Sequence, residues 1–229
     1  SMLKLKKNLR SICFVPIKKY SSKFKKKNFQ KIGNTQLYQI LLNKLLKIKS
    51  LFDEIIVEKD FKEIINFCKK KKLNYLIRPK KFTNSFITGN DLMKRWLKLK
   101  PNYHYYFHIH VTSPFIKKQT IKKAVKVLKS SKFNSVFTVE SDKSMYWYKN
   151  KEINHNSLIL KRSQDLHPIK KDTTCLYGIT KKEFQKNFSR IGTKPIMIET
   201  GKIESLDINE PADLKLAKSI YSLNKTIIN

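Results

Sequence analysis

The segment that follows the first predicted strand is rich in groups that bind phosphate. Residues 18–28 contain six lysines among eleven residues, together with the hydroxyls of Ser21 and Ser22 and the amide of Asn28. Lysine ammonium groups, serine hydroxyls and free backbone N–H groups are the donors that a triphosphate needs. A solvated basic loop would contain the same residue types, so composition leaves both interpretations open. A P-loop is excluded, because no Gly-x-x-x-x-Gly-Lys-Ser/Thr pattern occurs.

Three histidines form a second group of residues that could take part in metal binding or catalysis. His104, His108 and His110 are separated by even numbers of residues on one predicted strand, so their side chains would share one face of a sheet. Such a set can bind a metal, but a central strand covered by helices favours ordinary packing. His110 differs from the other two, because the end of the strand faces the predicted binding pocket.

The elements that must position these residues follow a regular order. Short apolar runs alternate with segments of helical periodicity, which predicts an α/β fold with a doubly wound, mostly parallel sheet. The predicted strands are 12–17, 54–57, 73–77, 103–111 and 135–139, and the predicted helices are 36–48, 61–68, 91–99 and 121–128. In such sheets the ligand lies beyond the carboxyl ends of the strands. The site is therefore expected in the loops after Ile17, Val57, Ile77 and Val111.

The pattern loosens in the second half of the chain. Residues 141–172 are predicted to leave the main sheet as strands or a hairpin that carries Tyr146, Trp147 and Tyr148. Exposed aromatic side chains on such an arm often make a subunit contact, although a loop packed on its own domain explains them equally well. Strands at 175–179, 195–199 and 203–208, a helix around Phe184 and a last helix over 211–223 complete a single domain spanning residues 1–229.

Composition narrows the class of protein. The chain has 50 Lys and Arg against 17 Asp and Glu, a net charge of +33, but only five of the basic residues are arginines. Proteins that read nucleic acid rely on arginine for bidentate contacts, so nucleic acid is not expected as a partner. No stretch approaches the ~18–20 apolar residues of a membrane span. The three cysteines are far apart and form no Cys-x-x-Cys pair, which predicts reduced thiols and a cytoplasmic location.

Seven short segments occur in the order typical of the CMP-sialic acid synthetase family, which the chain resembles over about residues 12–221. They are Phe14-Val15-Pro16-Ile17-Lys18 with Ser21 and Lys27-Asn28, Phe52-Asp53-Glu54-Ile55-Ile56-Val57 with Asp60, Arg78-Pro79, Val111-Thr112-Ser113-Pro114-Phe115, Ser135-Val136, Arg162-Ser163-Gln164-Asp165-Leu166-His167-Pro168, and Leu206-Asp207-Ile208-Asn209 with Pro211 and Asp213-Leu214. Each segment is weak alone, and their common order carries the resemblance.

The resemblance implies a nucleotide-diphospho-sugar transferase-like fold, a homodimer formed through the arm, and a CTP- and Mg²⁺-dependent reaction. A nine-carbon sugar acid would attack the α-phosphate of CTP to give a CMP-sugar and pyrophosphate. The residues implied to bind the nucleotide are Lys18, Ser21, Ser22, Lys27, Asn28, Arg78, Thr88 and Gly89. The residues implied to bind the sugar acid are His110, Thr112, Ser113, Gln164 and Tyr177. Lys18, Lys27 and Asp207 are the implied catalytic groups, and Asp207 with Asn209 the implied metal ligands.

Departures from the family pattern keep other functions open. Lys18 stands where the family has an arginine, Lys19-Tyr20 replaces Gly-Gly, and Asn209 replaces the second metal-binding aspartate. Thr173-Thr174 stands in place of Asn-Gly. Lysine cannot contact two oxygens as a fork, and an amide brings no charge to a metal. The alternatives are a related transferase acting on another acid, or a family member that binds nucleotide without turnover.

Overall fold

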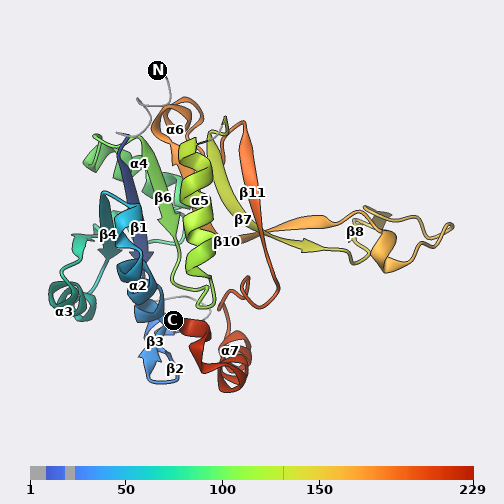
Figure 1. The fold of residues 1–229 in the computed structure, drawn as a ribbon, viewed down its shortest axis with the longest axis horizontal. Coiled ribbons are helices and arrows are strands. Elements are labelled where there is room, and N and C mark those ends of the chain that lie inside the picture. Colours follow the sequence, from blue (N-terminus) through green and yellow to red (C-terminus); the bar gives the residue numbers. More distant parts are fainter. Residues whose placement is uncertain (1–8, 19–23, 131) are drawn as a thin grey trace.

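A seven-stranded sheet forms the centre of the molecule (Figure 1). The computed structural model describes residues 9–18, 24–130 and 132–229. The sheet order is β11-β7-β10-β6-β1-β4-β5. The strands are β1 (Ser11–Ile17), β4 (Glu54–Lys59), β5 (Asn74–Ile77), β6 (Tyr105–Ile109), β7 (Ser135–Asp142), β10 (Ile169–Thr180) and β11 (Pro195–Thr200). All pairs are parallel except those of β10, which runs antiparallel to β6 and β7. The predicted mostly parallel α/β sheet is therefore confirmed.

Helices cover both faces of the sheet, because the side chains of a strand alternate between them. Val15 of β1 packs in the core under α2 (Leu37–Lys47), α3 (Lys62–Lys71) and α5 (Lys118–Ser130). Its neighbour Phe14 points to the opposite face, under α4 (Gly89–Leu99) and α6 (Lys181–Asn187). There it stacks on Trp96 with ring centroids 4.6 Å apart.

The last helix lies near the carboxyl ends of the parallel strands. Helix α7 (Pro211–Leu223) begins with proline in its first turn, and Glu210 and Asp213 form a capping box. It packs with Ile208 and the short hairpin β2–β3 (Lys31–Ile32 and Thr35–Gln36). Four short 3₁₀ turns connect the described elements, namely η2 (Lys27–Phe29), η3 (Lys49–Leu51), η4 (Lys80–Phe82) and η5 (Ser163–Asp165), and a fifth, η6 (Lys225–Ile228), follows α7.

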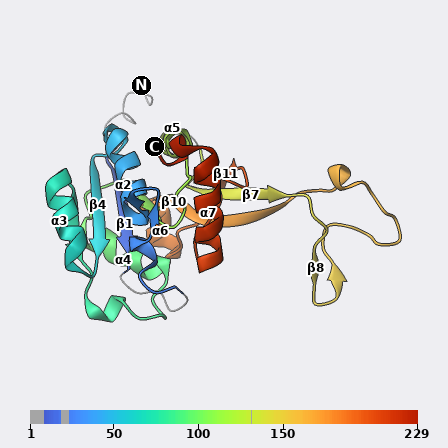
Figure 2. The ribbon, with the colours of Figure 1, turned by 90° about the horizontal axis from the view of Figure 1, so that it is seen from below.

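An arm projects from the body of the molecule between β7 and β10 (Figures 1 and 2). It contains the hairpin β8–β9 (Trp147–Tyr148 and Lys151–Glu152) and the turn η5. The arm carries large apolar side chains in solvent, namely Met145, Trp147, Tyr148, Ile153, Leu158, Ile159 and Leu160. The excursion predicted from the sequence is therefore present, and it does not fold back onto its own domain.

Two sequence-based expectations are wrong. Residues 203–208 do not form a strand. The chain turns there, with hydrogen bonds from Ser205 N to Gly201 O and from Leu206 N to Ile203 O. Their apolar pattern reflects packing of Leu206 and Ile208 against α7 rather than pairing in the sheet.

His104 does not share a face with the other two histidines. It precedes β6 and is exposed, and its Nδ1 accepts a hydrogen bond from Arg10 N. The strand begins only at Tyr105, so the even spacing that would align three histidines does not extend to residue 104.

Candidate functional site

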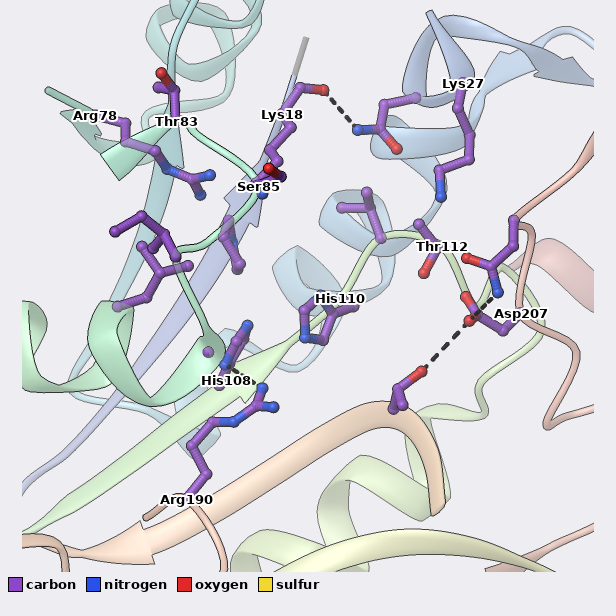
Figure 3. Close-up of a pocket in the computed structure, with 18 residues that line it drawn as sticks. Lys18, Lys27, Arg78, Thr83, Ser85, His108, His110, Thr112, Arg190 and Asp207 are labelled. Carbon is purple, nitrogen blue, oxygen red and sulfur yellow. Dashed lines mark hydrogen bonds between the residues drawn. The ribbon is translucent and has the colours of Figure 1, made fainter. Parts of the chain in front are cut away.

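A pocket of about 630 Å³ opens at the carboxyl ends of β1, β5 and β6 (Figure 3). This is the end of the sheet at which the α/β topology predicts a ligand. Strand ends, the segment before α4, the loop after α6 and the turn before α7 all contribute to its wall. The lining residues are Pro16, Lys18, Lys27, Asn28, Arg78, Thr83, Ser85, Ile87, Gly89, Leu92, His108, His110, Val111, Thr112, Thr174, Arg190, Asp207 and Asn209.

A buried arginine forms one side of the pocket. Arg78 follows β5, and its Nε donates a hydrogen bond of 2.8 Å to Oε1 of Glu58. Neither side chain of this ion pair is exposed. Glu58 also accepts hydrogen bonds from Trp96 and Arg95 of α4. Nη1 and Nη2 of Arg78 are buried without a hydrogen-bond partner among the described residues. Arg78 is thus a fixed cation with two donors left for an anion.

Lys18 and Lys27 form the adjoining part of the wall. Lys18 follows β1 directly, and its carbonyl accepts a hydrogen bond of 2.8 Å from Asn28 Nδ2. This bond ties η2, which contains Lys27, to the end of the strand. Burial and the neighbouring Arg78 lower the pKa of Lys18. The two lysines and Arg78 give the upper part of Figure 3 a strong positive charge.

Asp207 is the single carboxylate among the described residues that line the pocket. Its Oδ2 accepts hydrogen bonds from Asn209 Nδ2 at 2.7 Å and from Thr174 Oγ1 at 3.3 Å. Its Oδ1 is buried without a partner among the described residues. A free carboxylate oxygen beside a side-chain amide suits a hard cation, provided that the amide turns its oxygen toward the ion. These two residues fit Mg²⁺ bound mainly by substrate phosphates and water.

No cluster of three His, Cys, Asp or Glu side chains that could hold a metal occurs in the part of the chain that the structure describes. His108 and His110 lie with ring centroids 4.1 Å apart on the floor of the pocket. Burial, and then Arg190 and the other pocket cations, lower the pKa of His110 to about 3. Burial also holds the pKa of His108 well below its usual range. Both rings are therefore neutral near pH 7.

Most of the residues predicted from the sequence meet in this pocket. They are Lys18, Lys27, Asn28, Arg78, Gly89, His110, Thr112, Asp207 and Asn209. Ser21 and Ser22 lie outside the described residues. Thr88 stands just beyond the wall, where its hydroxyl accepts a hydrogen bond from Asp91 N and caps α4. Of the two neighbouring residues, Gly89 lines the cavity and Thr88 does not.

Three predicted sugar-binding residues lie away from the cavity wall. Ser113 is fully buried, and Tyr177 lies behind the wall, where its hydroxyl donates to the carboxylate of Asp172 at 3.0 Å. Gln164 belongs to the exposed arm, and its carbonyl accepts a hydrogen bond from Lys143. Within one chain Gln164 cannot help to line the pocket, because the arm projects away from the body (Figure 2).

Several residues of the pocket wall were not predicted from the sequence. Thr83, Ser85, Ile87 and Leu92 come from the segment before α4 and its first turn, and Thr174 comes from a bulge in β10. Arg190 was also missed, because it follows α6 and matches no motif. Its residue type was a usable signal: only five residues of the chain are arginines, and two of them, Arg78 and Arg190, line this pocket.

The mostly parallel sheet with its pocket at the strand ends matches the nucleotide-diphospho-sugar transferase-like fold of solved nucleotidyltransferases. The family model described as cytidylyltransferase matches residues 12–224. The chain therefore belongs to the cytidylyltransferase family of nucleotidyltransferases. No helix in the described residues is both long and apolar enough to cross a bilayer.

Solved structures agree on the fold at low sequence identity. A CMP:2-keto-3-deoxy-manno-octonic acid synthetase complexed with CTP superposes with a TM-score of 0.70 at 11% identity, covering 93% of this chain and 99% of that one. A 4-diphosphocytidyl-2C-methyl-D-erythritol synthase from Anaerococcus prevotii gives 0.63 at 15% identity, covering 93% and 99%. The bifunctional IspDF from Campylobacter jejuni gives 0.62 at 16%, covering 90% and 53%. No curated protein matches the chain.

Proposed function

We propose that this protein is a CTP-dependent cytidylyltransferase that activates a sialic acid-like sugar acid to its CMP-sugar and releases pyrophosphate. The observation that carries the proposal is the buried guanidinium of Arg78, whose two outer nitrogens have no partner among the described residues. Lys18 and Lys27 line the same wall, and Asp207 lines the wall beyond Lys27 (Figure 3). A fixed cationic cluster beside one carboxylate suits a triphosphate whose charge changes during transfer.

In this reaction the anomeric hydroxyl oxygen of the acid forms a bond to the α-phosphorus. The bond from that phosphorus to the oxygen bridging to the β-phosphate breaks, pyrophosphate leaves and the hydroxyl proton is released. Phosphoryl transfer depends on positioning and charge neutralisation more than on covalent help from the protein. Lys18, Lys27 and Arg78 supply the positive charge, and the hydrogen bond from Asn28 to Lys18 fixes the loop that presents it.

Asp207 and Asn209 are the residues that would hold Mg²⁺. When bound, the ion would neutralise phosphate charge and help to orient the triphosphate. Thr174 donates to the Asp207 carboxylate and so orients it. Below these residues, the neutral rings of His108 and His110 offer polar atoms without adding charge, which suits a sugar acid that brings its own charge.

A second candidate function is nucleotide binding without turnover. The observation that favours it is the hydrogen bond from Asn209 Nδ2 to Asp207 Oδ2. Asp207 is the single carboxylate among the described residues that line the pocket, and this bond already occupies one of its two oxygens. A transferase acting on another acid, such as an eight-carbon keto sugar acid, would use the same nucleotide site. The three possibilities differ in turnover and in acid preference.

The deciding experiment measures pyrophosphate release with CTP, Mg²⁺ and a panel of eight-carbon and nine-carbon sugar acids. The proposal predicts release that depends on a nine-carbon acid and is lost in Lys18→Met. Lys182→Met removes an exposed lysine of α6 and serves as the matched control. Release with only an eight-carbon acid would reassign the substrate. No release with any acid, combined with retained CTP binding, would favour the second candidate.

The same proposal includes a homodimer. The arm carries Trp147, Tyr148 and the run Leu158–Leu160 in solvent, and apolar patches of this kind mark contact surfaces in soluble proteins. Pairing through the arm would also let Gln164 of one copy approach the pocket of the other. The cytoplasmic location inferred from the cysteines stays a prediction.

A further inference from the structure

Arg190 is held rigidly against the start of α4. Its backbone N–H donates a hydrogen bond of 2.9 Å to Oδ1 of Asn90. Its guanidinium lies directly over Gly89, where a Cβ atom would come within 2.2 Å of Arg190 Cζ. Any larger residue at position 89 would push the guanidinium out of this position, so glycine leaves the space that Arg190 occupies. The guanidinium also stacks on the ring of Tyr177, with Cζ 3.9 Å from the ring centroid.

The hydrogen bond between Arg190 and His108 fixes the state of the histidine. Nη1 of Arg190 lies 3.0 Å from Nδ1 of His108. Arginine can only donate, so Nδ1 accepts and the neutral ring carries its proton on Nε2. That Nε2–H is buried and has no partner among the described residues. The pocket floor therefore contains a fixed guanidinium and an unused imidazole donor side by side.

Arg190 lacks the carboxylate partner that a half-buried guanidinium usually has. No ion pair of Arg190 occurs within residues 9–18, 24–130 and 132–229. Asp172 is a carboxylate that acts electrostatically on Arg190, but it accepts hydrogen bonds from the Tyr177 hydroxyl and from Thr174 N. A guanidinium withdrawn from water without an acid is costly unless a ligand supplies the negative charge.

Figure 3 shows Arg190 entering from the side of the pocket opposite Lys18 and Lys27, with His108 and His110 between. A triphosphate at the Lys18–Arg78 wall would leave this second cation unmatched. We infer that Arg190, with His108 beside it, forms a separate subsite that binds the carboxylate of the acid substrate. The inference rests on the proposed function and names the group by which the acid is recognised.

A carboxylate suits this subsite because its two oxygens match the planar fork of guanidinium donors. A sugar without the carboxylate would leave Arg190 unpaired and would bind poorly. The subsite therefore selects acids over neutral sugars, whereas the cluster of Lys18, Lys27 and Arg78 selects the triphosphate.

Steady-state kinetics test the subsite with the acid that supports pyrophosphate release. In Arg190→Met the KM for the acid should rise about tenfold to a hundredfold, while the KM for CTP stays within about twofold. Arg190→Lys keeps the charge but loses the forked pair of donors, so its KM for the acid should lie between those of wild type and Arg190→Met. Lys186→Met, an exposed position on α6, is the matched control. Equal increases in both KM values, or an increase for CTP alone, would overturn the inference.

Nuclear magnetic resonance of the arginine side chains tests the subsite without turnover. The chain has five arginines, so the Nε–H spectrum is simple, and Arg190→Lys identifies the signal of Arg190. With CMP present, N-acetylneuraminate and 2-keto-3-deoxyoctonate should shift this signal, and their methyl esters should not. A shift with acids but no pyrophosphate release would refute the proposed function and keep the subsite. A shift with CTP alone, no shift with either acid, or equal shifts with acids and esters would refute the subsite.

Discussion

Glu58 and Arg78 form an ion pair of 2.8 Å in which neither side chain is exposed. Glu58 lies in β4 and Arg78 directly follows β5, and these two strands pair in parallel. Glu58 also binds Trp96 and Arg95, so one carboxylate joins the sheet to α4 and directs Arg78 toward the pocket. Glu58 therefore supports both the packing of α4 on the sheet and the proposed nucleotide site.

Replacing Glu58 with glutamine should weaken both properties. Removing one partner of a buried pair leaves a charge without compensation, which costs about 3–5 kcal/mol of unfolding free energy. Arg78 would also lose its fixed orientation, so the KM for CTP should rise by about tenfold. Urea denaturation and initial-rate kinetics measure the two effects. Glu199→Gln breaks an exposed pair with Lys170 and should cost far less stability, because solvent screens that pair. Equal losses in the two variants would contradict the assigned role of Glu58.

CTP should stabilise the protein more than other nucleoside triphosphates do. The expectation rests on the ordered set Lys18, Ser21, Lys27, Asn28 and Arg78. A ligand at a hundred times its Kd raises the unfolding free energy by about 2.7 kcal/mol, because it binds only the folded state. Thermal unfolding with each nucleotide and Mg²⁺ measures the preference. Equal shifts with ATP and CTP would show a site that recognises phosphate alone.

The arm should hold two copies of the chain together. Light scattering at low micromolar concentration should give twice the chain mass of 27.1 kDa. Replacing Leu158 and Leu160 with serine should produce a monomer, because both side chains are mostly exposed on the arm. Leu223→Ser alters an equally exposed leucine at the end of α7 and should leave the dimer intact. A wild-type monomer would refute the dimer and remove Gln164 from any pocket.

The turn before α7 should set the requirement for Mg²⁺. Asp207→Asn should abolish turnover, because it removes the only carboxylate in the described pocket wall. Asn209→Asp should lower the Mg²⁺ concentration needed or raise the rate, since a hard dication prefers charged oxygens. Pyrophosphate release measured against Mg²⁺ concentration tests both variants. Glu63→Gln on the outer face of α3 is the control. If the wild-type protein is inactive and both variants are inactive as well, the result favours nucleotide binding without turnover.

Lys44 should make the unfolding free energy depend on pH in the alkaline range. Lys44 is 1% exposed, and its ammonium donates to the carbonyls of Pro114 and Ile116, in the loop that contains the pocket residue Thr112. Burial lowers the pKa of Lys44 from 10.5 to about 8. Between these values the unfolded chain binds more protons than the folded one, so the contribution of this residue to stability rises with pH.

The comparison with Lys44→Met isolates this effect from the other lysines. The stability of wild type relative to the variant should increase between about pH 8 and pH 10, by at most about 3 kcal/mol. Denaturant unfolding at several pH values measures the difference. A difference that is constant across this range would show that Lys44 keeps the same charge in the folded and unfolded states.

Local sequence patterns predicted the seven strands of the main sheet and the helices α2 to α7, but not the β2–β3 hairpin. Strand β1 and helix α7 were found almost to the residue, because a buried apolar run and a proline at a helix start are local signals. The strand expected at 203–208 was wrong because its apolar side chains pack on α7. Periodicity reports that a residue is buried, but it does not report which partner buries it.

The sequence by itself determined the alternation of strands and helices and the basic loop at the first strand end, since both follow from neighbouring residues. Only the tertiary structure decided which polar groups meet. Glu58 reaches Arg78, and Arg190 reaches His108 across 82 positions of the chain. Such pairs arise from the order of strands in the sheet and the packing of α4 and α6 on it. No local spacing encodes them, because the chain closes these distances only when the core forms.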